Sequence, residues 1–107
     1  MRRRRFVLTP EARQALIEIW DHIAEGSVSR ADHVLARLYD AFLRLARSPA
    51  MGHYREDLAD ARHRFWTVYP YVVAYRCHTT PLQIVAVVHG ARELKAFFEH
   101  RTENQGA

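Results

Sequence analysis

The segment Val87-Val88-His89-Gly90-Ala91-Arg92 places an imidazole and a guanidinium close together along the chain. The pattern predicts a strand that ends at His89 and a corner at Gly90, where both side chains leave the sheet. A histidine there can act as an acid or a base near neutral pH. Alternatively, His89 is a polar residue that closes the strand and hydrogen-bonds within the turn, which is the interpretation we favour.

Arginines form a second set of residues able to do chemistry. If the last three predicted strands form a meander, Arg62 and Arg64 lie on one strand, Arg76 on its neighbour and Arg92 just past the third. Several guanidinium groups on one sheet face would bind phosphate or carboxylate. Ordinary surface charge, paired with nearby acidic residues, is an equal alternative. Tyrosines interleave with these arginines, as on surfaces that stack on exposed bases, although strands favour tyrosine in any case. They are Tyr69, Tyr71 and Tyr75.

Other kinds of site lack support in the sequence. None of the seven histidines has a recognised metal-ligand spacing, and Cys77 is the only cysteine, so we expect no metal, no cofactor and no disulfide. No apolar run approaches the roughly 18 to 20 residues of a membrane helix, and no export signal follows the N-terminal arginines. We therefore expect a cytoplasmic protein without membrane contact.

The charge balance points to an anionic partner. The formal net charge is +4, and fifteen of the sixteen Lys and Arg residues are arginine, Lys95 being the exception. A basic surface suits nucleic acid or an acidic protein. A bias toward arginine codons in a GC-rich genome explains the same composition, so charge alone does not choose a function.

The first half of the chain predicts a strand and two helices. Residues 3–8 alternate as a strand does, and Thr9-Pro10 is typical of a helix start, with Thr9 as the N-cap. Apolar residues then recur at helical spacing up to Gly26, which we expect to end the helix as a left-handed cap. Ser27 or Ser29 can cap a second helix that stops near residues 47–48, because Pro49 disfavours helical geometry before it. The short link predicts an antiparallel helical hairpin.

The second half predicts a sheet. Residues 49–60 are expected to form an exposed connection, followed by strands at 62–69, 71–77 and 82–88 and a short helix at 92–100. The order β-α-α-β-β-β-α segregates helices from strands. It indicates an α+β fold, a small, mainly antiparallel sheet packed by a helical hairpin. We expect a single domain over residues 1–107, with its core at about 3–100 and a flexible tail at 101–107.

Six short motifs occur in order over roughly residues 6 to 98. They are Leu8-Thr9-Pro10-Glu11-Ala12 leading into Leu16-x-x-Ile19-Trp20, Leu45-Ala46-x-x-Pro49-x-x-Gly52, Arg55-x-Asp57-Leu58, Arg64-Phe65, Tyr71-Val72-Val73-x-Tyr75-Arg76, and Ile84-Val85-x-Val87-Val88-His89-Gly90-Ala91-Arg92-Glu93. Together they resemble the ParE/RelE toxin superfamily of bacterial type II toxin–antitoxin systems, on the ParE side. The resemblance implies the fold just described and a cognate antitoxin, commonly acidic, whose C-terminal segment wraps the toxin in a hetero-oligomer.

The resemblance divides the expected function in two. RelE-like members cut mRNA on the ribosome with basic residues and a Tyr or His near the C-terminus, whereas ParE-like members are reported to poison DNA gyrase. This chain departs from the RelE pattern, because its last predicted helix offers Phe97 and Phe98, which carry no hydroxyl, and lysine is nearly absent. An RNA-cleaving site would have to draw on His89, Tyr75, Glu93, Arg64 and Arg92.

We therefore expect a ParE-like toxin that inhibits gyrase without catalysis. The alternatives are a ribosome-dependent mRNA endonuclease and a non-toxic interaction subunit of the same fold, so enzyme activity stays open. The residues expected to bind the target are Arg62, Arg64, Arg76, His89 and Arg92. The residues expected to bind the antitoxin are Leu16, Trp20, Leu38, Tyr39 and Phe42.

Overall fold

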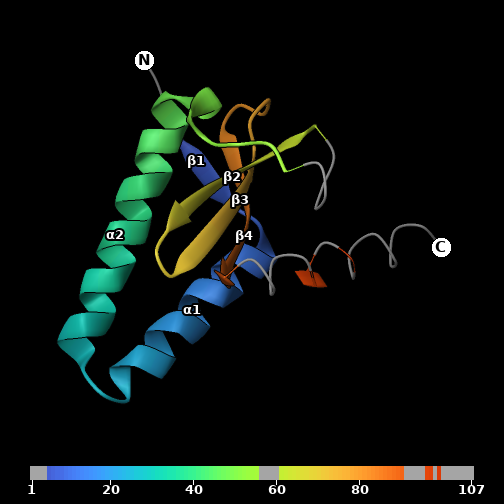
Figure 1. Cartoon of the computed structure of the whole chain (residues 1–107). Helices are drawn as coiled ribbons and strands as arrows, with labels where there is room; N and C mark the ends of the chain where they lie inside the picture. The colour runs from blue at the N-terminus through green and yellow to red at the C-terminus, as the bar shows by residue number, and fades with distance from the viewer. Residues whose placement is uncertain (1–4, 56–60, 91–95, 98, 100–107) are drawn as a thin grey trace.

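The computed structural model of the protein describes residues 5–55, 61–90, 96, 97 and 99. Two helices lie against a small sheet, which occupies the angle between them (Figure 1). The elements in chain order are β1 (Phe6–Leu8), α1 (Pro10–Ala24), α2 (Val28–Arg47), the 3₁₀ helix η1 (Pro49–Met51), β2 (His63–Val68), β3 (Tyr71–Arg76) and β4 (Leu82–His89).

The four strands form one sheet in the order β1-β4-β3-β2. Strands β2, β3 and β4 are the predicted antiparallel meander, and β1 adds to β4 in parallel, with Phe6 opposite Leu82. A parallel pair cannot be closed by a tight hairpin, and here everything from α1 to β3 lies between the two strands. The sheet is therefore mixed, and β4 is central, as its almost wholly apolar sequence predicts.

Thr9 joins β1, α1 and β4. Its side-chain oxygen accepts a hydrogen bond from the Ala12 backbone N–H at 3.0 Å, which caps α1, and its hydroxyl donates to the Val85 carbonyl at 2.9 Å. The Thr9 N–H donates to the Ile84 carbonyl at 3.0 Å. The bonds to Ile84 and Val85 reach β4 beside the register shift in its pairing with β3. The predicted N-cap is confirmed, and it also fixes where α1 leaves the sheet.

The hairpin of α1 and α2 is antiparallel and its turn is short, as predicted. Ser27 caps α2 by accepting from the Arg30 N–H at 3.1 Å, and the Trp20 indole donates to Asp32 at 2.8 Å across the two helices. The expectation of a left-handed cap at Gly26 was wrong. α1 ends through Glu25 in right-handed helical geometry, and Gly90 is the residue with positive φ among those described.

The sheet is buried on both faces. One face packs against α1 and α2 in a cluster that includes Phe42, Leu38 and Tyr75. The other face carries a smaller cluster of Phe65, Ala74, Val85 and Ala86, against which Phe97 packs. No described helix is both long and apolar enough to cross a membrane.

The expectation of an exposed connection at 49–60 was wrong over its first part. Residues 49–51 form η1, Gly52 is buried, and His53 pairs with Phe65 at the edge of the sheet. Residues 56–60 lie outside the described residues, as do the predicted tail and all of the predicted helix at 92–100 except 96, 97 and 99.

Candidate functional site

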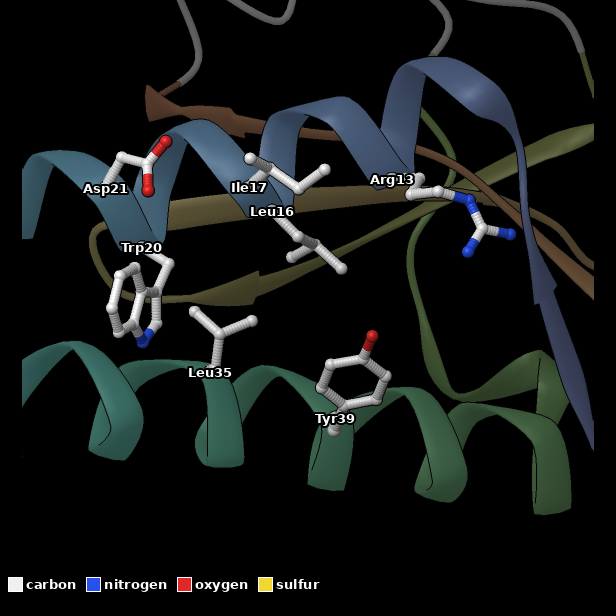
Figure 2. Close-up of a pocket in the computed structure, with 7 residues that line it drawn as sticks. All are labelled: Arg13, Leu16, Ile17, Trp20, Asp21, Leu35 and Tyr39. Carbon is white, nitrogen blue, oxygen red and sulfur yellow. The ribbon is translucent and has the colours of Figure 1, made fainter.

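An apolar groove runs between α1 and α2. Its volume is about 300 Å³, and Figure 2 shows Leu16 and Trp20 pointing from α1 toward α2, with Leu35 and Tyr39 pointing back. The full lining is Arg13, Leu16, Ile17, Trp20, Asp21, Leu35 and Tyr39. Ile17 is 49% exposed and Tyr39 is 41% exposed, so apolar surface faces solvent here. An open apolar groove between two helices suits a helix of a partner protein.

Charged side chains mark the two ends of this helical groove. The Arg13 guanidinium lies at the end nearer Tyr39, and the Asp21 carboxylate lies at the opposite end beside Trp20 (Figure 2). From Arg13 to Asp21 the groove follows eight residues of α1, about 12 Å, or roughly two helical turns. A bound segment with an acidic group at one end and a basic group at the other would fit its charges.

The residues predicted to bind an antitoxin divide between groove and core. Leu16, Trp20 and Tyr39 line the groove, whereas Leu38 and Phe42 are fully buried beneath the hairpin and present no surface to a partner. The sequence reasoning missed Arg13, Ile17, Asp21 and Leu35. Ile17 carried a usable signal, because it is a large apolar residue just off the buried stripe of α1.

Tyr75, a candidate acid or base, is a core residue. Its side chain is fully buried, and its hydroxyl donates to the Pro49 carbonyl at 2.6 Å and accepts from the Gly52 N–H at 2.8 Å. Burial raises the pKa of the Tyr75 phenol above its ordinary value, and the bond from Gly52 and the nearby Arg64 charge only partly oppose this. A phenol with these two protein bonds and no exposure does not meet a substrate.

Arg64 also binds the segment that follows α2. One terminal nitrogen donates to the Gly52 carbonyl at 2.7 Å and to the Ala50 carbonyl at 3.2 Å. The guanidinium carbon lies 4.1 Å from the centroid of the Tyr54 ring. Arg64 therefore holds the chain from Ala50 to Tyr54 against β2, and a phosphate would have to displace these contacts.

His89 lies at the other end of the sheet. It is exposed at the end of β4. The Tyr71 ring packs edge-on against the imidazole, with 5.6 Å between the two ring centroids. Burial raises the pKa of the Tyr71 phenol. A hollow of about 350 Å³ lies between the end of β4 and α1. His89 borders this hollow from β4, and Glu18 and His22 border it from α1. Sequence reasoning missed Glu18 and His22, although their spacing of four on α1 places them on one face.

The predicted basic face is not brought together within the described part of the chain. Arg76 is opposite Gln83, whereas His89 is opposite Tyr71, five residues away along β3 and so about 16 Å distant. Arg64 is opposite Tyr75, so it lies on the other face of the sheet from Arg76. Arg62 is exposed in the turn before β2, and Arg92 and Glu93 lie outside the described residues. Within those residues, no three potential metal ligands gather.

Comparisons with known proteins give one sequence-profile match and a solved structure of similar fold. The sequence profile described as ParE toxin of type II toxin-antitoxin system, parDE, matches residues 6–94. A solved structure entitled "Chromosomal ParDE TA system from P. aeruginosa" is similar in fold, with a TM-score of 0.67 at 18% sequence identity. The similarity covers 81% of this chain and 96% of that one. No curated protein matches the sequence significantly.

The contact between Gly52 and Tyr75 predicts the effect of one methyl group. A Cβ at residue 52 would lie 2.5 Å from the Tyr75 hydroxyl and 2.8 Å from the Phe65 carbonyl. Gly52→Ala should therefore lower the free energy of unfolding by about 1 to 3 kcal/mol, as overpacking does. Chemical denaturation measures the loss.

Gly26→Ala is the matched control. A Cβ there meets only the Ile23 carbonyl at an ordinary 3.7 Å, so stability should stay the same or rise by up to about 1 kcal/mol. Equal losses in the two variants would show that the Tyr75 contact is not tight.

Proposed function

The chain belongs to the ParE toxin family of type II toxin–antitoxin systems, and from this we propose that it inhibits DNA gyrase by binding and is neutralised by a cognate antitoxin. It would act in the cytoplasm as part of a toxin–antitoxin hetero-oligomer. The observation that carries the proposal is the placement of Tyr75, whose hydroxyl bonds Pro49 and Gly52 inside the core.

That placement argues against the alternative of an mRNA endonuclease. Cleavage at a 2′-hydroxyl needs a base for that hydroxyl and an acid for the leaving oxygen, both within hydrogen-bond reach of one phosphate. Tyr75 is enclosed, Arg64 is bound to backbone carbonyls, and His89 lies at the far end of the sheet. The described members of the candidate catalytic set therefore do not converge on one phosphate, which favours action by binding.

The helical groove supports the antitoxin half of the proposal. Its apolar floor and length of about two turns suit an amphipathic helix that presents side chains at positions i, i+3 or i+4, and i+7. Arg13 would pair with an acidic residue of that helix, which matches the acidic antitoxins implied by the family resemblance. The similar solved structure is itself described as a ParDE system, which is consistent with such a partner.

A supercoiling assay tests the proposed target. Purified toxin should inhibit supercoiling by gyrase, or trap cleaved DNA, in proportion to its concentration. Antitoxin mixed with the toxin beforehand should prevent this loss of supercoiling activity. Full supercoiling at saturating toxin would contradict gyrase as the target. Cleavage of mRNA by the same preparation in a translating extract would favour the endonuclease instead.

A substitution in the groove tests the antitoxin site. Ile17→Asp places a carboxylate in an apolar contact, so it should weaken antitoxin binding by about 2 kcal/mol or more, roughly thirtyfold. Isothermal titration calorimetry measures the change, and the exposure of Ile17 means that folding should survive.

The control for this experiment is Val28→Asp. Val28 is 54% exposed at the start of α2 and does not line the groove, and an acidic residue suits a helix N-terminus. Its affinity for antitoxin should equal that of the unmodified protein. If Ile17→Asp also binds normally, the antitoxin docks elsewhere.

A further inference from the structure

Two charged residues of α1 have signs that do not suit their own helix. Arg13 is the fourth residue of α1, and Asp21 is the fourth residue from its end. The helix dipole favours acidic side chains near the first of these ends and basic side chains near the second. Glu11 and His22 of the same helix follow this preference, whereas Arg13 and Asp21 reverse it. The stability of α1 therefore does not explain these two charges.

Neither charge is neutralised within the part of the chain that the structure describes. Arg13 and Asp21 are both exposed, and among the described residues they form no ion pair. Neighbouring carboxylates do have partners in the protein. Glu18 accepts a hydrogen bond from the Gln14 amide at 3.1 Å, and Asp32 accepts one from the Trp20 indole at 2.8 Å. Arg13 and Asp21 are thus available to a binding partner.

The two charges lie at opposite ends of the helical groove. Figure 2 shows Arg13 at the end nearer Tyr39 and Asp21 at the end beside Trp20, with apolar side chains between them. Asp32 adds a second carboxylate near the Trp20 end. The macrodipoles of α1 and α2 oppose each other, because the two helices are antiparallel. The side-chain charges therefore decide the polarity of the groove, which is basic at one end and acidic at the other.

We infer that the order of these charges selects which helix the groove accepts. An accepted helix presents an acidic residue to Arg13 and a basic residue to Asp21, about two turns apart. A helix with the reverse order meets like charges at both ends and is rejected. The inference rests on the proposed antitoxin site, and it specifies which antitoxins can neutralise this chain.

Exposed charges of this kind act on specificity more than on affinity. An attractive pair at the rim of an interface contributes little, because water and salt screen it. Like charges brought together at an interface cost more, because each loses hydration without gaining a partner. Removal of both charges should therefore change the affinity only slightly, whereas their reversal should weaken binding strongly.

Isothermal titration calorimetry with the full-length cognate antitoxin tests the inference on the full chain. The neutral variant Arg13→Gln, Asp21→Asn should bind within about threefold of the unmodified protein. The reversed variant Arg13→Glu, Asp21→Arg keeps the net charge and should bind about tenfold or more weakly. Its unfolding temperature should stay the same or rise, because both new charges suit the dipole of α1. Lower affinity with equal or higher stability is the result that supports the inference.

The matched control reverses the other two charges at the same ends of α1. Glu11→Arg, His22→Glu alters residues that do not line the groove, so the affinity for antitoxin should stay unchanged. Its unfolding temperature should fall, because both new charges oppose the helix dipole. The control and the reversed variant should therefore show opposite patterns of stability and affinity.

The groove variant Ile17→Asp separates a failure of this inference from a failure of the proposed antitoxin site. If Ile17→Asp weakens binding but the reversed variant binds normally, the order of the charges is irrelevant and the inference is overturned. A fall in both the stability and the affinity of the reversed variant would show a structural role, and equal loss of affinity in the control would show a general charge effect. Either result would contradict the inference. Normal binding by Ile17→Asp would remove the proposed antitoxin site and the inference with it.

Discussion

The hydroxyl of Tyr75 is the contact on which most of the structure depends. It sits in the core between β3 and the helices, and its two hydrogen bonds, to Pro49 and Gly52, reach back across more than twenty residues of sequence. Without them, the chain after α2 would leave polar backbone groups unpaired near the core. The Arg64 guanidinium stabilises the same segment by donating hydrogen bonds to the carbonyls of Ala50 and Gly52. Two residue types that suit catalysis are thus used to close the fold.

This use of Tyr75 and Arg64 leaves the surfaces proposed for binding elsewhere on the molecule. The apolar groove lies between α1 and α2, and His89 borders a second hollow beside α1. Thr9 contributes to this arrangement, because its bonds to Ile84 and Val85 set where α1 starts on the sheet. A toxin with separate surfaces can meet the proposed antitoxin and the proposed target by different faces.

Local signals in the sequence predicted most of the elements. Thr9-Pro10, Ser27 and Pro49 act on residues beside them, so the helix starts and the end of α2 follow from the sequence, as do the three strands of the meander. Apart from the local cap expected at Gly26, the failures involve distant partners. Gly52 looked like a loop glycine, but it is small because Tyr75 lies against it. The parallel pairing of β1 and the contacts of Arg64 likewise depend on residues far along the chain, which periodicity does not reveal. Of the expected antitoxin residues, Leu38 and Phe42 proved to be core because apolar spacing does not separate a buried stripe from its exposed edge.

We propose that this toxin stops growth through DNA topology and not through mRNA. The order of events after induced expression in cells measures this most directly, with a DNA-damage reporter and pulse-labelled protein synthesis followed together. We predict that the reporter rises while protein synthesis continues and messages stay intact. An early loss of protein synthesis with cleaved messages and a silent reporter would contradict the claim.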